Sequence, residues 1–155
     1  MIDDAAVDAL LAAARRAREH AYAPYSGFAV GAAVQTDAGT FAGANVENAS
    51  YPVGTCAERV AAAAAVSAGA RRIGAVVVTT RATRPTPPCG MCRQFLYEFG
   101  PGMVVISEGG DGTRRRWRLG ELLPDAFGPD DLGETLAVGS GDGAGAATEI
   151  QEGRP

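Results

Sequence analysis

Two short segments decide how this sequence is interpreted: Thr55-Cys56-Ala57-Glu58-Arg59 and Pro88-Cys89-Gly90-Met91-Cys92-Arg93-Gln94, which together hold all three cysteines of the chain. Three thiols can supply the three protein ligands of a catalytic zinc ion, which keeps its fourth position open for water. Because the chain has no fourth cysteine, a closed structural site made of thiols alone is excluded. We therefore predict that the three cysteines bind one zinc ion and that the Glu58 carboxylate lies beside it.

Both segments are predicted to begin helices, one over residues 56–67 and the other over residues 89–99. Free N–H groups and the positive end of the dipole at a helix start favour a thiolate over a thiol. The two cysteines of the second segment are three residues apart, so one turn of helix places them on the same side. Glu58, two residues after Cys56, would lie near the metal without binding it, where a carboxylate can carry protons for a metal-bound water.

The hydrophobic pattern of the remaining chain alternates between helix and strand. The β-branched run at 73–79 indicates a strand that is buried on both faces. Strands joined by helices favour a sheet with parallel pairs, covered by helices. The predicted fold is therefore α/β, a three-layer α/β/α sandwich with a mixed five-stranded sheet. The other predicted elements are a helix over 3–21, strands over 28–36 and 40–46 joined by a turn at 37–39, strands over 103–106 and 113–119, and a short helical turn at 122–123.

Length and composition indicate one catalytic domain over residues 1–132 and a glycine-, alanine- and acid-rich tail over 133–155 that we expect to be disordered. All fourteen basic residues are arginine, so the chain has neither a Schiff-base lysine nor a phosphate-loop lysine. The first residues are acidic and helical and do not show the pattern of a signal peptide, and no apolar run is long enough for a membrane span, so we expect a cytoplasmic protein without a membrane partner. In that compartment a cysteine cluster is more often metal-binding or catalytic than disulfide-forming.

Other interpretations of these residues remain open at this stage. Cys89 and Cys92 could form a redox pair, or a structural zinc site could recruit His20 or a carboxylate, although His20 is expected at the surface of the first helix. Arg59 could offset the charge of the metal thiolates or form an ordinary surface salt bridge. The arginines around Trp117 could suggest nucleic acid, but the net charge of −4 favours a solvated strand face and no nucleic-acid partner.

Five ordered segments carry a resemblance to a known family. The chain resembles the small zinc-dependent cytidine deaminases, the homotetrameric type, from about residue 22 to residue 132. The two cysteine segments match the signature in which a glutamate follows the first ligand and a P-C-x-x-C comes later. The other matching segments are Tyr25-Ser26-Gly27-Phe28-Ala29-Val30-Gly31-Ala32, Asn45-Val46-Glu47-Asn48-Ala49-Ser50-Tyr51-Pro52 and Glu121-Leu122-Leu123-Pro124-Asp125-Ala126-Phe127-Gly128-Pro129. The chain departs from the family in having Gly27 where a larger residue is common, and in its longer tail.

The resemblance implies a role for each matching residue. Cys56, Cys89 and Cys92 would bind zinc, Glu58 would shuttle protons, and Arg59 would contact the ligand thiolates. The substrate would be held by Phe28 against the pyrimidine, by Asn45 and Glu47 on the side of the ribose 3′-hydroxyl, and by the backbone amides of Ala57 and Cys89, which would orient the base. The resemblance also implies a homotetramer with shared active sites, in which Ala49, Tyr51 and Phe127 come from neighbouring subunits.

The reaction implied by the resemblance is the hydrolytic deamination of cytidine and 2′-deoxycytidine to the uridines and ammonia, a step of pyrimidine salvage. Zinc would lower the pKa of its bound water, and Glu58 would pass protons to N3 and then to the leaving amine. One alternative is a relative that acts on another aminopyrimidine nucleoside, such as a blasticidin-type antibiotic, but Asn45 and Glu47 suit a free ribose. The other alternative, a non-catalytic zinc-stabilised binding module, would have no use for Glu58.

Overall fold

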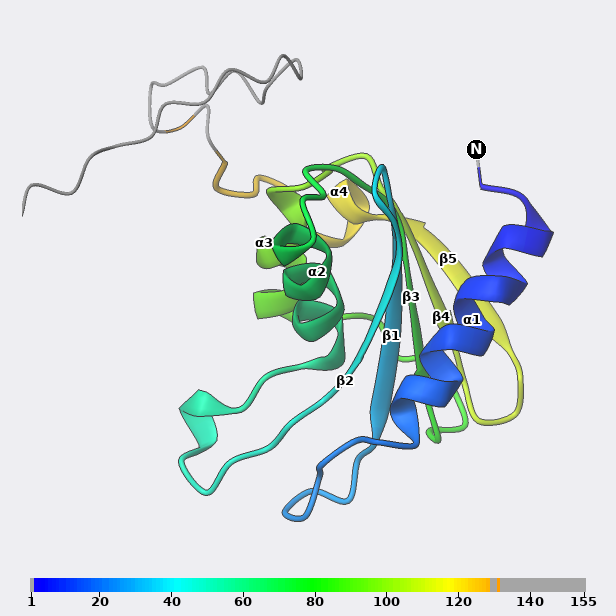
Figure 1. The fold of residues 1–155 in the computed structure, drawn as a ribbon, viewed down its shortest axis with the longest axis vertical. Helices are drawn as coiled ribbons and strands as arrows, with labels where there is room; N and C mark the ends of the chain where they lie inside the picture. The colour runs from blue at the N-terminus through cyan, green and yellow to red at the C-terminus, as the bar shows by residue number, and fades with distance from the viewer. Residues whose placement is uncertain (1, 129–130, 132–155) are drawn as a thin grey trace, which may run out of the picture.

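A mixed sheet of five strands forms the centre of the computed structural model, which describes residues 2–128 and 131 (Figure 1). The strand order is β2-β1-β3-β4-β5, in which only the β3–β4 pair is parallel. This arrangement confirms the predicted α/β fold with a mixed five-stranded sheet. The strands are β1 (Val30–Thr36), β2 (Gly39–Ala44), β3 (Ile73–Thr80), β4 (Val104–Glu108) and β5 (Arg114–Arg118).

Helices cover both faces of the sheet, so the predicted three layers are present (Figure 1). Helix α1 (Asp4–Arg18) lies on one face, and its first turn is capped by the Asp3 carboxylate, which accepts a hydrogen bond of 2.8 Å from the Ala6 N–H. Helices α2 (Ala57–Ser67) and α3 (Gly90–Tyr97) lie on the other face. A 3₁₀ turn at Tyr51–Val53 and a short helix α4 (Leu119–Leu122) complete the described elements. None of these helices has the length and apolar character that crossing a bilayer requires.

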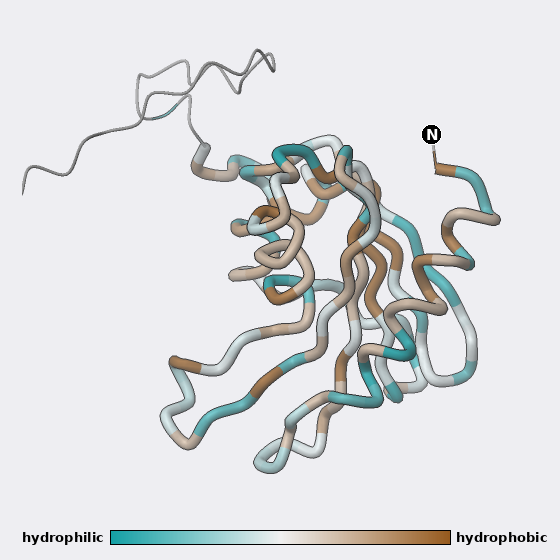
Figure 2. Tube along the Cα trace, in the orientation of Figure 1, coloured by the Kyte–Doolittle hydropathy of each residue, from teal (hydrophilic) through white to brown (hydrophobic). Residues whose placement is uncertain are grey.

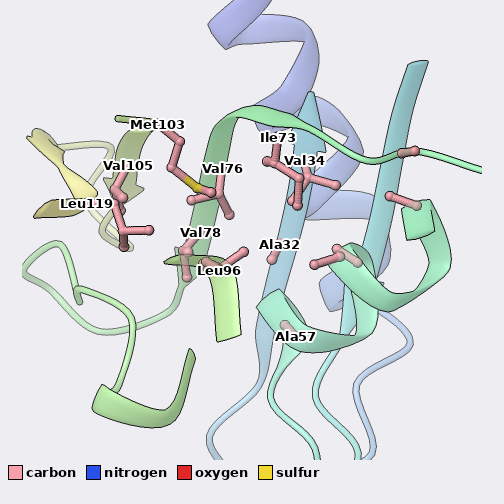
Figure 3. Packing of buried hydrophobic residues seen from close by; sticks show 14 residues of the cluster. Ala32, Val34, Ala57, Ile73, Val76, Val78, Leu96, Met103, Val105 and Leu119 are labelled. Carbon is pink, nitrogen blue, oxygen red and sulfur yellow. The ribbon is translucent and has the colours of Figure 1, made fainter. Parts of the chain in front are cut away.

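Side chains along β3 alternate between the two faces of the sheet and so contribute to two separate hydrophobic cores. Val76 and Val78 face α2 and α3, whereas Ala75 and Val77 face α1, and all four are buried. Figure 2 shows hydrophobic residues concentrated on the central strands, and Figure 3 shows the core on the α2 side, where Leu96 and Ala57 meet the sheet. A strand that is buried on both faces is what its β-branched sequence predicts.

The alanines of α2 allow this helix to lie very close to the edge strand β2. A Cβ atom at Gly43 would come within 2.6 Å of the Ala61 nitrogen and within 2.8 Å of the Val60 side chain. Ala61, Ala62 and Ala65 are fully buried. The small alanine side chains therefore permit this close packing, which fixes the first turn of α2 against the sheet.

The strand directions bring the starts of α2 and α3 to the same edge of the sheet. Both β2 and β3 run antiparallel to β1, and their last residues lie beside its beginning: Gly31 pairs with Ala44 on one side and with Thr79 on the other. The segments that leave β2 and β3 therefore depart from one edge, where they lead into α2 and α3. Sites in open α/β sheets form at such carboxyl ends of strands.

Several element ends differ from the predicted ones. The first helix ends at Arg18 and not near residue 21, because the Tyr22 N–H bonds the Asn45 carbonyl at 3.0 Å and the chain must extend there. The second strand of the hairpin ends at Ala44, and Val46 makes only isolated bridges, to Tyr22 and Thr55. The helical turn predicted at 122–123 is α4 and begins earlier. The predicted disordered tail at 133–155 lies outside the described residues.

The arginines of β5 take part in ion pairs with α1 and in stacking. Glu108, which is buried at the end of β4, accepts two hydrogen bonds from Arg15, at 2.9 and 2.6 Å, and one of 3.1 Å from Arg114. These contacts hold the pKa of Glu108 below its ordinary value, despite its burial. The Arg115 guanidinium lies 5.0 Å from the centre of the Trp117 ring.

Candidate functional site

The three cysteine sulfurs form one cluster at the edge where α2 and α3 begin. Cys56 and Cys89 are the residues that precede the first turns of α2 and α3, and neither side chain caps its helix. Their sulfurs are 3.9 Å apart, and all three sulfurs lie within 4.8 Å of one another. Zinc–sulfur bonds of about 2.3 Å in a tetrahedral arrangement require sulfurs about 3.8 Å apart. The cluster therefore has the dimensions of a three-thiolate zinc site.

The protonation of the cluster also suits a metal. The hydrogen bond from the Cys92 thiol, with those from Cys89 and Arg59, lowers the pKa of Cys56 to about 5, against the opposing effect of burial. The pKa of Cys92 is raised, because its proton is held in the bond to Cys56 and because the side chain is buried. The lowered pKa of Cys56 favours the thiolate form that binds zinc, and zinc binding would displace the remaining thiol protons.

Arg59 follows Glu58 in the first turn of α2, close enough to the cluster to influence the pKa values of both Cys56 and Glu58. Its positive charge helps to lower the pKa of Cys56, and its Nη2 donates to the Gly54 carbonyl at 3.1 Å. Its Nε is buried without a hydrogen-bond partner among the described residues. A buried, incompletely paired guanidinium is costly unless an anionic group lies nearby. This placement favours charge compensation of thiolates over the surface salt bridge considered from the sequence.

Glu58 is buried in the wall of the site, in the first turn of α2. Its side chain is only 5% exposed, and burial raises the pKa of its carboxyl group, with a further contribution from the negative charge of Cys56. A carboxyl group that is held close to its protonated form can accept a proton and return it. The place and environment of Glu58 therefore suit a proton carrier.

A cleft of about 310 Å³ opens in front of the cluster and joins six of the residues singled out from the sequence. The cleft has an apolar wall with a few polar groups, and it is large enough for a nucleoside-sized molecule. Thr80, Thr86 and Pro87 also line it, and the sequence analysis did not assign them a role; Thr86 and Pro87 directly precede the second cysteine segment. The six residues are Phe28, Asn45, Glu47, Cys56, Glu58 and Cys89.

Asn45 and Glu47 are held in place by the loop that follows α1. The Asn45 side chain accepts a bond from the Val30 N–H at 2.8 Å and donates to the Phe28 carbonyl at 2.9 Å, so only one of its N–H groups is left for a ligand. The Glu47 carboxylate accepts bonds from the Tyr25 N–H and from the hydroxyl and N–H of Ser26. The bond from the Ser26 hydroxyl is the main cause that lowers the pKa of Glu47 and keeps it ionised.

Ser26 is thus a site residue that the sequence analysis missed. Its hydroxyl donates to Glu47 and accepts the Phe28 N–H at 3.0 Å, so it connects the polar and the aromatic sides of the cleft. The only available signal was its place in the segment Tyr25-Ser26-Gly27-Phe28, where a serine two residues before an aromatic residue can form a local turn.

The remaining predicted substrate residues lie around the cleft and not in it. Ala57 is fully buried in the first turn of α2. Tyr51 lines an adjoining hollow of about 320 Å³ that shares Ser26 and Glu47 with the cleft. Ala49 and Phe127 are exposed, and neither lines the cleft among the described residues. The Phe127 carbonyl is held by the Gln94 side chain at 2.7 Å.

Comparison with known proteins agrees with this geometry. Residues 5–108 match the family described as the cytidine and deoxycytidylate deaminase zinc-binding region. Cytidine deaminase from Halalkalibacterium halodurans is 43% identical over 127 residues, 81% of this chain and 96% of that protein. Cytidine deaminase from Mycobacterium tuberculosis is 46% identical over 120 residues, 77% of this chain and 87% of that protein. The crystal structure of cytidine deaminase from Burkholderia pseudomallei is 48% identical, covers 77% of this chain and 98% of its own, and superposes with a TM-score of 0.74. The chain therefore belongs to the cytidine deaminase family and carries the family's zinc-binding region.

Proposed function

We propose that the chain catalyses the hydrolytic deamination of cytidine and 2′-deoxycytidine to uridine and 2′-deoxyuridine, with release of ammonia. The observation that carries this proposal is the buried Glu58 carboxyl group, which lies in the wall of a nucleoside-sized cleft beside the three-thiol cluster. A purely structural metal site needs neither the cleft nor a buried carboxyl group with a raised pKa.

Cys56, Cys89 and Cys92 would hold the zinc ion, which supplies a polarised water with a lowered pKa when it is bound. Glu58 takes a proton from the attacking water and gives it to N3 of the base, so that C4 becomes more electrophilic. Glu58 then delivers a proton to the departing amino group. Arg59 offsets the negative charge of three thiolates, which would otherwise oppose the loss of a proton from the water.

The cleft residues orient the nucleoside. Phe28, which is 42% exposed at the mouth of the cleft, packs against the pyrimidine ring. Asn45 offers its remaining N–H, and the ionised Glu47 offers acceptor lone pairs, to the ribose hydroxyl groups. The backbone N–H groups of Ala57 and Cys89 orient the base. A free ribose hydroxyl meets a donor and an acceptor in this arrangement, which supports a nucleoside over a free base as substrate.

The active unit is a homotetramer with active sites shared between subunits. Large apolar side chains gather on the exposed segments near the cleft: Tyr22, Tyr25, Phe28, Val46, Tyr51 and Val53. Tyr51 is 76% exposed and Phe127 is 60% exposed, and large exposed apolar side chains of this kind often mark an interface. Ala49, Tyr51 and Phe127 would therefore complete a neighbour's cleft and exclude water from it. Light scattering should give a mass near four chains, and a stable monomer would contradict this arrangement.

A direct assay tests the proposed activity. Incubation with cytidine should convert its ultraviolet absorption to that of uridine and release one ammonia per uridine formed. A zinc chelator should abolish turnover, and added zinc should restore it. Conversion that continues after all metal has been removed, or no conversion by protein that carries one zinc per chain, would refute the proposal.

A further inference from the structure

Arg93 joins the second cysteine segment to the end of α4. Its Nε donates to the Pro88 carbonyl at 2.7 Å, and its Nη1 donates to the Leu122 carbonyl, also at 2.7 Å. The side chain reaches back over the turn of α3 that precedes it, as helical side chains do, and this brings the guanidinium to Pro88. Within residues 2–128 and 131, the Arg93 guanidinium forms no ion pair with a carboxylate. Its charge is therefore directed at backbone carbonyl groups.

The Pro88 carbonyl belongs to the same peptide group as the N–H of Cys89. The chain has no cis peptide among the described residues, so this carbonyl and this N–H point in opposite directions. Pro88 is buried, and Cys89 lines the cleft. A guanidinium that holds the carbonyl on the buried side therefore turns the N–H toward the open side. The Cys89 N–H has no acceptor in the described part of the chain, so it is available to a ligand.

The contact also changes the donor strength of this peptide group. A hydrogen bond from a charged donor is roughly twice as strong as one between neutral groups. Bonding of a cation to the carbonyl withdraws electron density from the peptide group, and connected hydrogen bonds strengthen one another. Arg93 therefore both orients the Cys89 N–H and makes it a better donor.

We propose that Arg93 is a positioning residue for the reaction: by holding the Pro88 carbonyl, it directs the Cys89 N–H into the cleft as the donor for the carbonyl oxygen of the pyrimidine. The inference rests on the proposed function, because that carbonyl oxygen belongs to the proposed substrate. The second hydrogen bond of Arg93, to the Leu122 carbonyl, keeps the guanidinium in a fixed orientation. The neighbouring Gln94 side chain donates to the Phe127 carbonyl of the same C-terminal segment.

Arg93→Gln tests the role in catalysis, with Arg71→Gln as a matched control. Arg71 also donates to two backbone carbonyls, of Val66 and Ala70, at 3.1 and 2.8 Å, but it lies before β3, away from the carboxyl ends of the strands where the cleft opens. With zinc content unchanged, Arg93→Gln should lower kcat/KM for cytidine by roughly 10- to 100-fold, the usual scale for residues that hold site groups in place. The loss should fall mainly on KM, because the carbonyl oxygen is bound both before and during the reaction. Arg93→Lys keeps the charge and one bond, so it should recover part of the loss.

A spectroscopic measurement follows the Cys89 N–H itself. The chain has three cysteines, so labelling with ¹⁵N-cysteine gives three backbone amide signals. Uridine is the product of the proposed reaction and is not converted further. At saturation it should shift the signal of the Cys89 amide proton of the zinc-loaded wild-type protein downfield. This shift should become smaller in Arg93→Gln and stay unchanged in Arg71→Gln.

Two results would overturn the inference about Arg93. The first is a wild-type Cys89 signal that does not respond to uridine although uridine inhibits the enzyme. The second is an Arg93→Gln enzyme whose kcat falls in proportion to lost zinc while KM stays at the wild-type value. Failure of the proposed function is recognised separately, because the wild-type protein would then neither convert cytidine nor bind uridine.

Discussion

A pair of substitutions tests whether the active site is built from more than one chain. Glu58→Gln removes the proposed proton carrier, and Phe127→Ala removes an aromatic side chain that does not line the cleft of its own chain among the described residues. Each variant alone should be impaired for a different reason. Tetramers assembled from both should regain activity only if Glu58 and Phe127 reach one active site from different subunits.

The size of the Phe127 effect follows from its exposure. Complete burial of a phenylalanine side chain contributes about 1.5–3 kcal/mol. Since 60% of Phe127 is exposed in the single chain, covering a neighbour's substrate should contribute about 1–2 kcal/mol. This corresponds to a roughly 5- to 30-fold higher KM for Phe127→Ala. At cytidine concentrations far below KM, this variant should retain roughly 3 to 20% of the wild-type rate, whereas Glu58→Gln should retain roughly 1% or less.

The mixing experiment distinguishes an active site shared between subunits from one built within a single chain, because the two predict different rates for the mixture. In random tetramers made from equal amounts of both variants, about one quarter of shared sites receive wild-type Glu58 from one chain and wild-type Phe127 from another. Co-expression of differently tagged chains should therefore give about a quarter of the wild-type rate. If each site used residues of one chain only, the mixture would show half the rate of the Phe127→Ala enzyme. A rate that equals the fraction of Phe127→Ala chains multiplied by the rate of that variant, at every mixing ratio, would refute the shared site.

Three further predictions concern stability and specificity. Glu108→Gln should lower the free energy of unfolding by about 1–2 kcal/mol in denaturant titrations, because the buried carboxylate is paired with two half-exposed arginines. Contacts with the two arginines lower the pKa of Glu108 in the folded protein below its ordinary value of 4.5. The difference in unfolding free energy between wild type and Glu108→Gln should therefore be complete above pH 4.5 and should disappear as the pH falls through the lower pKa of the folded state. A difference in unfolding free energy that grows on acidification would contradict this prediction. Gly43→Ala should lower stability by about 1–3 kcal/mol through overpacking against α2, whereas Gly74→Ala, whose Cβ meets nothing within 4 Å, should show no such packing penalty in the same thermal unfolding assay. Free cytosine should react with a kcat/KM at least ~100-fold below that of cytidine, since it has no ribose hydroxyl groups to meet the remaining N–H of Asn45 and the remaining lone pairs of Glu47; equal values would remove the ribose contacts from the proposal.

The metal centre could be predicted from the sequence because its three ligands lie in two short segments with recognisable spacing. The spacing of Cys89 and Cys92 matches one helical turn, and Cys56 begins another helix, so few arrangements of the three thiols are possible. The hydrophobic pattern likewise predicted the strands and their burial. Both kinds of inference depend on short-range periodicity, which a sequence displays directly.

The hydrogen bonds that hold the cleft together could not be predicted in this way. Ser26 meets Glu47 across 21 residues, and Arg93 meets Leu122 across 29 residues. Such partners are set by how the strands and helices pack, and no spacing rule links them. The same holds for the end of α1, where a bond from Tyr22 to Asn45 prevails over a helical pattern that continues to residue 21.

Polar residues near a predicted site can also hold the local backbone in place, a role that their position in the sequence does not indicate. Asn45 was predicted from the resemblance to bind ribose, yet one of its N–H groups and its carbonyl oxygen hold the backbone of residues 28–30. One residue can thus support the cleft and contact the ligand. An Asn45 substitution would disturb both functions, so it is a poor test of ribose recognition compared with a change of substrate.

The central claim is that Glu58 moves protons for a deamination at the zinc site. Its most direct test is the turnover of cytidine by Glu58→Gln, compared with the wild-type protein at equal zinc content. Glutamine keeps the size of the side chain but cannot carry the proton, so we expect one zinc per chain, an unchanged fold and a loss in kcat of roughly 10²- to 10⁴-fold. A Glu58→Gln enzyme that binds zinc and releases ammonia at a rate near that of the wild-type protein would contradict it.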